Sequence, residues 1–505
     1  MSENFTSYQV TDFSGGQNSN VSEMLKDNNE LDLIRNGQLT KIGLIQKRLG
    51  YATQRGSDVS TGKILGAHSF YPYSGTIRQY AVADSASDSD VYTFNPATNS
   101  WTAHHLALTM GSKCEFATFL NLFFRVNYTE ATASNDGTAW STTTDVTNAP
   151  KARYIIPYLN RLYLGECKVG SSEYASRVYY SSLPDPSTSA ITWDVSDTGN
   201  WFEVNPDDGD SIKGLGVNAN RLLVFKENSL YRYDTNTLYE VPGCPGTVSQ
   251  RTVKNIQGYT IYLHSSGVWA YDGSTSQLIS RPMQQYIEGM NTLNLSEACA
   301  YVRGDHYYCF IGNVINSAEG INEENVLLDF DVSKKSWTFH NLNNVPTIFI
   351  DYKDDRSNVE YDSATVTYDS ADTTYDGGIV NESRAFMGTN AGKVWQFLNG
   401  NNDAGTGIRF EVITKEIFLS NRDAIKNLYK LMVYTRKGTS LMVQYKIDSG
   451  QWISLGALNR EFTDFRFPRG TRCRKIQLRF SEFTSAQQPT IEAFSIYYKE
   501  ETLTK

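Results

Sequence analysis

The sequence predicts an all-β protein: a β-propeller of about seven blades, preceded by an N-terminal arm and followed by a C-terminal β-sandwich domain. Three observations support this prediction. Two hairpin phrases recur along the chain, and aromatic residues make up 13% of the composition. The length of 505 residues also exceeds what one hydrophobic core usually organises, unless the domain grows by repetition. Aromatic side chains pack well on pleated sheets, and glycine and asparagine supply the turns between strands.

The first phrase is an aromatic-rich strand, an Asn or Asp turn, and often a Trp that opens the next strand. It reads VYTFNPATNSW, LYRYDTNTLYEV, VWAYDGSTSQLI, LLDFDVSKKSW and VWQFLNGNN. The second phrase is a pair of apolar strands around a short Asn or Gly turn. It reads FATFLNLFFRVN, IIPYLNRLYLGE, GLGVNANRLLVFKE, VKNIQGYTIYLHSSGVW and AYVRGDHYYCFIG. Two hairpins make a four-stranded blade, so the alternation of these phrases predicts a propeller.

The boundaries follow from where this repetition starts and stops. Residues 60–404 carry the phrases and are the predicted propeller. Within them, 355–380 is an exposed insertion, since its Tyr-Asp pairs recur every seven residues without the apolar seams of a coiled coil. Residues 405–505 alternate apolar and polar positions in short strands, which is typical of a β-sandwich. Residues 1–59 form the N-terminal arm, in which 22–33 has the pattern of a short amphipathic helix.

Composition excludes several classes of protein. No apolar run approaches the ~18 residues of a membrane-spanning helix, and the first residues lack the pattern of a signal peptide. The cysteines are scattered without a CxxC pair, which predicts free thiols in a reducing compartment. They are Cys114, Cys167, Cys244, Cys299, Cys309 and Cys473.

The formal net charge of −9 argues against a general nucleic-acid-binding protein. One short stretch near the C-terminus is nevertheless strongly basic. Two interpretations stay open for it: pairing with acidic neighbours at an interface, or contact with DNA phosphates at one end of a channel. Its cations are Arg466, Arg469, Arg472, Arg474, Lys475 and Arg479.

No catalytic residue, metal ligand or cofactor site is predicted. SNDGTAW, from Ser134, resembles a sialidase Asp-box but is one residue short and occurs once, and an Asn-Asp-Gly turn explains it. The six histidines show no HxH or HxxxH spacing. The acidic run 207–210 lacks the final Glu of an EF-hand loop. No GxxxxGK[ST] motif is present.

Residues 13–51 carry a family resemblance. An FSGG start, an Asn-Glu segment ahead of an Arg-Asn pair, and a closing Lys-Arg-x-Gly-Tyr resemble the opening of phage tail nozzle, or packaged-DNA stabilization, proteins. The family's usual Pro in the closing motif is Leu49 in this chain. The matching residues, read as an assembly and docking motif, are Phe13, Gly15, Gly16, Glu30, Arg35, Asn36, Lys47, Arg48, Gly50 and Tyr51.

The resemblance implies a structural protein of the virion tail, made in the host cytoplasm. Such proteins form a ring, commonly of about six copies, below the portal and adaptor of a short-tailed virion. There they extend the DNA channel and help to retain the packaged DNA. The implied partners are further copies of the chain, tail adaptor and portal-side proteins, tail fibre or spike proteins, and double-stranded DNA in the lumen.

Two other functions remain as alternatives. The exposed tyrosines of the 355–380 insertion favour an adsorption protein that binds a host receptor or glycan. A hydrolase built on a propeller is the third possibility. A ring-former should assemble, an adsorption protein should bind whole cells, and a hydrolase should release sugar.

Overall fold

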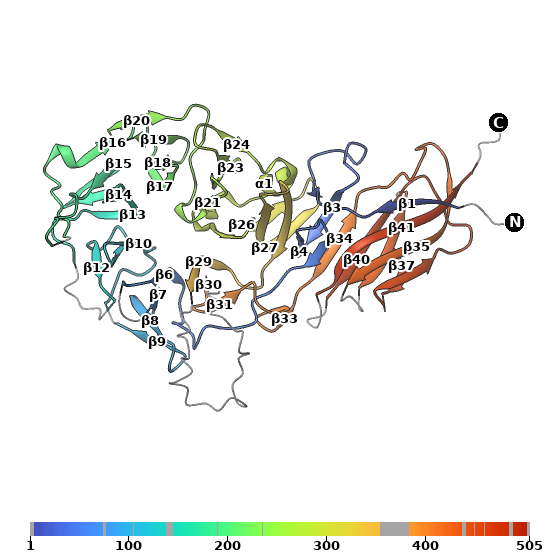
Figure 1. Cartoon of the computed structure of the whole chain (residues 1–505), viewed down its shortest axis with the longest axis horizontal. Helices are drawn as coiled ribbons and strands as arrows, with labels where there is room; N and C mark the ends of the chain where they lie inside the picture. Colours follow the sequence, from blue (N-terminus) through green and yellow to red (C-terminus); the bar gives the residue numbers. More distant parts are fainter. Residues whose placement is uncertain are drawn as a thin grey trace.

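The computed structural model confirms the all-β class and the propeller. It has two lobes: a propeller lobe on the left of Figure 1 and a C-terminal lobe on the right. The predicted insertion at 355–380 lies outside the described residues. The structure describes residues 5–73, 77–104, 106–137, 145–188, 190–234, 236–353, 383–436, 441–448, 450–458, 460–483 and 488–501.

The propeller lobe consists of small antiparallel sheets arranged around a common axis (Figure 1). The first three contain β6–β9 (Ile64–Phe70, Arg78–Asp84, Ser89–Asn95, Ser100–Ala103), β10–β12 (Glu115–Phe119, Leu122–Val126, Ala133–Asn135) and β13–β16 (Lys151–Tyr158, Arg161–Val169, Ser172–Tyr180, Trp201–Glu203). Next come β17–β20 (Ile212–Asn218, Arg221–Lys226, Leu230–Asp234, Thr237–Glu240) and β21–β24 (Lys254–Ile256, Tyr259–His264, Gly267–Tyr271, Ser276–Leu278). The last are β25–β28 (Cys299–Arg303, His306–Asn316, Ile321–Asp331, Ser336–Asn341) and β29–β31 (Pro346–Lys353, Ser383–Thr389, Val394–Phe397).

Short helical segments occupy some of the connections between these strands. The α-helix α1 covers Gln284–Glu288, and the 3-10 turns are η1 (Thr198–Asn200), η2 (Gln250–Thr252), η3 (Arg281–Met283) and η4 (Thr292–Glu297). Around the axis, β6 contacts β10, β10 contacts β13, and β13 contacts β17. The series continues through η2, β21 and β25 to β29, which contacts β6 again. The propeller therefore closes on itself.

The predicted hairpins are confirmed. The second phrase forms the first hairpin of five sheets, as in the β13–β14 and β17–β18 pairs. Three of its turns place two consecutive non-glycine residues at positive φ: Leu120 (51°) and Asn121 (59°), Leu159 (43°) and Asn160 (58°), and Ala219 (46°) and Asn220 (58°). This is the signature of a type I′ turn, which suits the twist of a two-residue hairpin. Neighbouring sheets then bury their facing apolar side chains against each other.

Arg251, on η2, crosses the propeller axis. Its Nε lies 2.8 Å from Oε1 of Glu115, and its terminal nitrogens donate to the carbonyls of Thr347 (2.9 Å), Cys114 (3.2 Å) and Leu65. These groups come from β29, from the start of the β10–β12 sheet, and from β6. A guanidinium that is only 7% exposed thus connects sheets on several sides of the axis.

The C-terminal lobe contains two sheets over one apolar core. One has the order β38-β35-β41-β5-β4, with β1 on β41 and β39 on β35. The other extends the β25–β28 sheet through β3, β34, β40, β36 and β37, with β2 on β3. The N-terminal strands are β1 (Thr6–Val10), β2 (Gly16–Gln17), β3 (Glu30–Arg35), β4 (Gly37–Leu39) and β5 (Ile45–Lys47). The others are β34 (Phe410–Thr414), β35 (Lys426–Arg436), β36 (Met442–Ile447), β37 (Ile453–Ala457), β38 (Phe462–Arg466), β39 (Arg472–Cys473), β40 (Ile476–Glu482) and β41 (Thr490–Glu500), with the small pair β32 (Asn402–Asp403) and β33 (Thr406–Gly407) between the lobes.

The N-terminal segment is part of this chain's own lobes and not a free arm. β1 and β5 pair with β41, and β3 lies between β28 and β34. The predicted helix over 22–33 is wrong, because residues 22–29 form turns and β3 starts at Glu30. Strand neighbours on both sides of β3 decide this, since they satisfy its backbone groups while Leu31 and Ile34 enter the core.

All six cysteines are buried and free of disulfides. Among the helices of the described residues, none is long and apolar enough to cross a membrane.

Replacing Arg251 with Met should lower the free energy of unfolding by about 3–5 kcal/mol, measured by urea denaturation. The loss is expected because the buried carbonyls of Leu65 and Thr347 lose their donor and Glu115 loses its cation. The control is Arg303→Met, on the exposed end of β25. Equal losses in the two variants would mean that the axial contacts add nothing to stability.

Candidate functional site: the junction of the two lobes

A single strand, β3, belongs to both lobes. It pairs antiparallel with β34 over Leu31 to Arg35, and it meets β28 of the propeller in parallel, with Arg35 opposite Phe339. The sheet therefore runs without a break from the propeller into the C-terminal lobe (Figure 1). The residues that carried the family resemblance cluster around this strand.

Asn36 ends β3 in the left-handed region, at φ 53°. Its amide N–H donates to the carbonyl of Phe339 (2.8 Å), and its side-chain Nδ2 donates to the carbonyl of Arg409 (2.7 Å). Its Oδ1 accepts from Nε of Arg48 (2.9 Å) and from the amide of Asn341 (3.0 Å). Asparagine tolerates this backbone conformation better than most residues. One buried side chain thereby contacts both lobes and the segment that follows β5.

Arg48 is 2% exposed and completes this contact. Its guanidinium forms a two-pronged pair with Asp403, at 2.9 and 2.5 Å. It also donates to the carbonyls of Leu49 (3.0 Å) and Asn341 (2.8 Å). With the bond to Asn36, all five N–H donors are used. A buried guanidinium with this many partners requires each of them to be in register.

Three further ion pairs, made by Lys47 and Arg35, lie near Arg48. Nζ of Lys47, on β5, pairs with Glu482 of β40, and both side chains are at most 1% exposed. Arg35 donates to Glu411 of β34 at 2.5 Å and also pairs with Glu323 of β27. Such pairs gain little over apolar packing, but removing one partner leaves an uncompensated buried charge. These ion pairs therefore determine which residues meet at the junction, and they add little to the free energy of unfolding.

Gly50 and Tyr51 attach the next segment to the propeller. A Cβ on Gly50 would overlap the carbonyl of Asn402, so only glycine fits there. The Tyr51 side chain is fully buried, and its hydroxyl accepts from the amides of Asn343 (2.9 Å) and Asn344 (3.0 Å). Burial, with a smaller contribution from the charge of Asp403, raises the pKa of Tyr51, which keeps the phenol neutral.

The FSGG start supports β3 from the other side. Gly16 has a φ of 68°, and a Cβ there would lie 2.8 Å from the carbonyl oxygen of Trp337 on β28. A Cβ on Gly15 would lie 2.8 Å from Cγ of Glu30. Phe13 is buried in the core, with its ring centroid 6.3 Å from that of Phe494. Close backbone approach and a left-handed φ therefore require glycine at position 16, whereas a Cβ at position 15 would first meet side chains.

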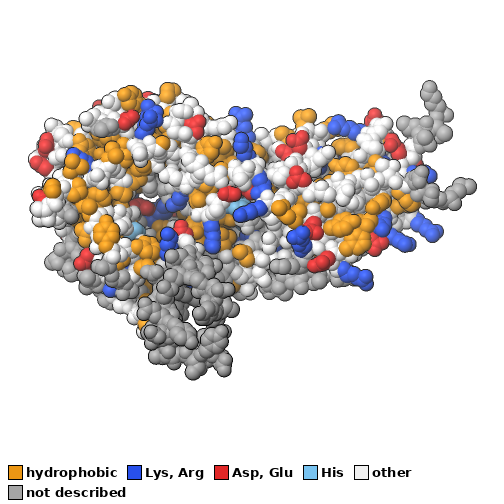
Figure 2. All heavy atoms as spheres, in the orientation of Figure 1, with side chains coloured by type: hydrophobic (Ala, Val, Ile, Leu, Met, Phe, Trp, Pro, Cys, Tyr) orange, Lys and Arg blue, Asp and Glu red, His pale blue; other side chains and the backbone are white. Residues whose placement is uncertain are grey.

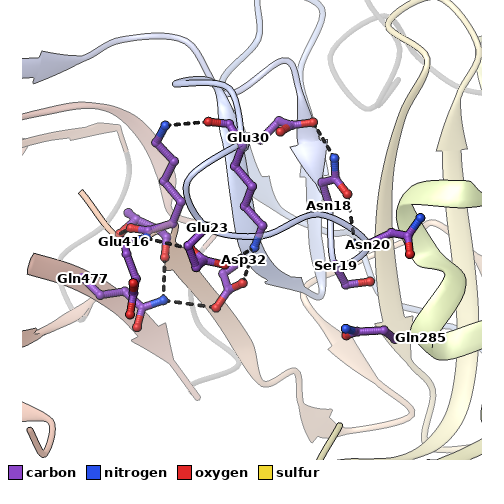
Figure 3. A network of polar contacts seen from close by, with 12 residues as sticks. Asn18, Ser19, Asn20, Glu23, Glu30, Asp32, Gln285, Glu416 and Gln477 are labelled. Atoms are coloured by element: carbon purple, nitrogen blue, oxygen red, sulfur yellow. Dashed lines mark hydrogen bonds and ion pairs between the residues drawn. The ribbon is translucent and has the colours of Figure 1, made fainter. Parts of the chain in front are cut away.

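A polar network then covers one side of β3, shown in Figure 3. Lys26 pairs with Glu23 and with Asp32, each at 2.5 Å, and Gln477 of β40 donates to Asp32 at 3.1 Å. Glu23 also accepts from the amide of Glu416 at 2.9 Å. Burial would lower the pKa of Lys26, but the two carboxylates outweigh it and raise the pKa. The loop before β3 is thus held against the C-terminal lobe.

A histidine pair lies in the β25–β28 sheet beside this junction. Asp329 is 2.7 Å from Nδ1 of His306 and 3.2 Å from Nε2 of His340. Burial alone would raise the pKa of Asp329, but the two histidines outweigh it and hold that pKa below its usual value. Tyr308, stacked on His306, accepts a hydrogen bond from Gln38 of β4 at 2.7 Å. The pair therefore contacts the N-terminal segment through one tyrosine.

The structure divides the basic stretch into two parts. Lys475 pairs with Glu416 at 2.6 Å, and Arg479 pairs with Glu411, so both belong to the junction. The four remaining arginines lie at the end of β38, in the following turn and around β39, and all are exposed: Arg466, Arg469, Arg472 and Arg474. They lie away from the junction, near the start of β35, where β41 finishes.

The acidic partners of the junction were not found from the sequence. Asp403, Glu411 and Glu482 are isolated carboxylates far along the chain from residues 35–48. One weak signal exists: Glu411 and Glu482 each occur in an otherwise apolar strand, where a buried charge needs a partner.

No protein-family model matches the chain, and no curated protein matches it. The chain is similar in structure to the extracellular domain of a hybrid two-component system from B. thetaiotaomicron, at 10% identity and a TM-score of 0.46. The match covers 92% of this chain and 62% of that one, so the chain spans less than two thirds of that protein.

Two further structures are similar at lower scores. BamB from Moraxella catarrhalis has 11% identity and a TM-score of 0.35, over 78% of this chain and 100% of that one. An exo-β-1,3-galactanase from Phanerochaete chrysosporium has 10% identity and a TM-score of 0.23, over 90% of this chain and 100% of that one. Likenesses at these scores assign no activity, ligand or partner to this chain.

The contacts at the junction join the two lobes. Within the residues that the structure describes, no group of three or more His, Cys, Asp or Glu side chains could hold a metal ion. A surface hollow of about 340 Å³ lies near the β4–β5 turn, lined by Thr40, Lys41, Ile42, Leu44, Gln46, Arg436 and Thr490. The buried charges at the junction instead bind one another, and they hold the two lobes in one orientation.

The variant Arg48→Lys should lower the free energy of unfolding by about 2–4 kcal/mol, measured by urea denaturation. Lysine keeps the charge, but it cannot reach Asp403, Asn36 and Asn341 together. The matched control Arg466→Lys changes an exposed arginine and should stay within about 0.5 kcal/mol. If Arg48→Lys has the same free energy of unfolding as the parent, the five-donor arrangement is not needed for stability.

Stability should depend on pH through His306, whose pKa burial would lower but Asp329 raises. Its contribution is complete below the ordinary histidine pKa and disappears as pH rises through the raised one. The unfolding free energy of the parent minus that of His306→Asn should therefore be larger near about pH 6 than near about pH 9.

His264 supplies the control, because burial lowers its pKa. The folded state resists protonation of His264, so the parent loses stability relative to His264→Asn as pH falls. The two variants should thus show opposite trends between the same two pH values. The same trend in both would contradict the ion pair between His306 and Asp329.

Proposed function

We propose that the chain is a non-enzymatic structural protein of a phage virion tail. In this proposal it forms a ring of about six copies at the tail nozzle, below the portal and adaptor. The ring extends the DNA channel and retains packaged DNA until release. Its partners are other copies, adaptor and portal-side proteins, tail fibres or spikes, and the DNA in the lumen. It is made in the host cytoplasm and resides in the virion tail.

One observation carries this proposal. The residues that resemble the opening of tail nozzle proteins are the residues that join the two lobes. Arg35 and Asn36 connect β28 to β34, and Arg48 and Tyr51 connect β5 to the propeller. A nozzle subunit under the pressure of packaged DNA needs two lobes that do not move apart. A shared strand with buried ion pairs supplies that stiffness.

The architecture in this proposal is a propeller of seven blades followed by a β-sandwich. Support for the count comes from the first strands β6, β10, β13, β17, β21, β25 and β29, each of which opens a separate hairpin around the axis. Support for the sandwich comes from Leu431 and Leu478. They lie on different sheets of the C-terminal lobe and share its core.

The position of Arg251 favours a DNA conduit that lies between subunits and does not pass through a propeller. Its guanidinium and the paired Glu115 occupy the propeller axis. The DNA would pass through the lumen that a ring of subunits encloses. The non-enzymatic assignment is supported by the buried charges: Lys47, Arg48 and Asp329 each have partners within the fold.

One observation favours an adsorption protein as the alternative function. Exposed tyrosines follow the first strand of two propeller sheets: Tyr71 (38%) and Tyr73 (88%) after β6, and Tyr259 (42%) after β21. Aromatic faces at strand turns suit stacking on sugars of a host surface.

The proposal is tested by the mass of the purified chain in solution, alone and with the portal–adaptor complex of the same virion. The expected result is a ring of defined mass on the adaptor, because the rigid two-lobed subunit presents one fixed surface to it. A second variant, Arg48→Ala, tests whether the junction matters for assembly. Its lobes should separate more easily, so the yield of rings should fall. A monomer that ignores the adaptor and binds host cells would overturn the nozzle assignment in favour of the adsorption protein.

A further inference from the structure

Charge is distributed unevenly along this chain. Residues 405–505 contain 17 Lys and Arg against 10 Asp and Glu, while residues 1–404 contain 29 against 45. Residues 405–505 are therefore net cationic, and residues 1–404 are strongly anionic. Figure 2 shows Asp and Glu at the left extremity of the propeller lobe, and Lys and Arg along the lower right of the C-terminal lobe.

The cationic charge is concentrated in a basic tip, defined as Arg466, Arg469, Arg472 and Arg474. β39 pairs with the start of β35, beside the end of β41, so this tip lies where the chain ends. Figure 1 places that end farthest from the propeller. Arg472 pairs with Glu501 at 2.9 Å. For Arg466, Arg469 and Arg474, the described residues offer no carboxylate partner.

The anionic charge is concentrated in an acidic segment, residues 181–212. It contains seven Asp and Glu and not one Lys or Arg. The segment runs from the end of β15 through β16 to β17, at the extremity of the propeller lobe opposite the C-terminal lobe (Figure 1). Two of its carboxylates are paired within the propeller, Asp208 with Lys226 and Glu203 with Arg177.

Four of the other five carboxylates of the acidic segment face solvent, and Asp210 is half-buried. Asp185, Asp194, Asp197 and Asp207 are exposed, and no cation among the described residues pairs with them. Local hydrogen bonds orient three of them, from the amides of Ser187 (2.8 Å), Ser196 (2.9 Å) and Gly199 (2.8 Å). The hydroxyl of Ser187, together with the amides of Ser187 and Thr188, lowers the pKa of Asp185 to about 2. The charges are thus fixed in place before any partner arrives, so binding orders few side chains.

We propose that the basic tip of one copy docks on the acidic segment of the next, in a head-to-tail contact between copies of this chain. Within one molecule the two surfaces lie at opposite extremities and cannot meet. Between copies, each contact leaves another basic tip and another acidic segment free. Such a contact is heterologous, so it closes into a ring if the rotation allows, and otherwise extends as a filament.

The inference rests on the proposed ring and names the surfaces that would build it. Complementary charge raises association rates and selects the partner surface, but screening weakens it once charges are separated by more than about 10 Å at 0.1 M salt. Assembly through this contact should therefore weaken steeply as salt rises. An apolar interface would respond to salt much less.

The test is a charge swap followed by sedimentation velocity, in the full-length chain. The tip variant carries Arg466→Glu, Arg469→Glu and Arg474→Glu. The segment variant carries Asp194→Lys and Asp197→Lys with Asp207→Lys. Each variant alone presents like charges at both ends, so self-association should weaken at least tenfold. An equimolar mixture of the two should assemble again, since each then offers the charge that the other lacks.

The matched control reverses three exposed cations of the propeller lobe that lie outside both surfaces: Arg303, Lys335 and Lys353. It changes the net charge as much as the tip variant does, and it should assemble like the parent. Folding of every variant is checked by its urea midpoint.

Three outcomes would overturn the inference: a tip variant that assembles like the parent, a mixture that fails to recover, or a tip variant that has lost only DNA binding. Adaptor binding is measured separately. A parent that binds the adaptor but never self-associates through these ends would sink this contact and leave the nozzle assignment standing. A loss of adaptor binding, with charge-swap assembly intact, would support this contact and argue against the nozzle assignment.

Discussion

The structure depends on one strand, β3, that pairs with strands of both lobes. β3 completes the β25–β28 sheet on one side and the β34–β40 sheet on the other, so both lobes share its backbone hydrogen bonds. An edge strand is exposed to pairing with other chains, and β3 covers the outer edge of β28. The same strand that closes this edge also fixes the orientation of the C-terminal lobe. Separation of the lobes would break a continuous sheet.

Buried charge makes this arrangement specific. Lys47 with Glu482, and Arg48 with Asp403, lie at the lobe junction with almost no exposure. Apolar side chains could fill the same space with equal or better stability, but they would tolerate a shifted register. A guanidinium whose five N–H donors are all occupied does not tolerate such a shift. Burying these charges costs free energy. Their pairing, however, permits only one packing of the N-terminal segment between two distant parts of the chain.

The charge outside the junction is organised on a larger scale. The basic residues of the C-terminal lobe divide into a paired group at the junction, including Arg479, and an unpaired group at the far tip, including Arg469. The acidic residues of the propeller divide in the same way, with Asp208 paired and Asp194 free. Internal pairs hold the subunit together, while the free groups at opposite ends suit contacts between subunits.

The sequence by itself determined the elements that depend on neighbours in the chain. Hairpins such as Phe116 to Asn127 were found because a type I′ turn and alternating strands are local patterns. The motif residues from Phe13 to Tyr51 were also found, but not their position. Local pattern favoured a helix over 22–33, whereas β3 is a strand because β34 pairs with it on one side and β2 and β28 pair with it on the other. Only the tertiary structure could bring Asp403 to Arg48 and Glu482 to Lys47, because buried charges choose their partners by proximity in space.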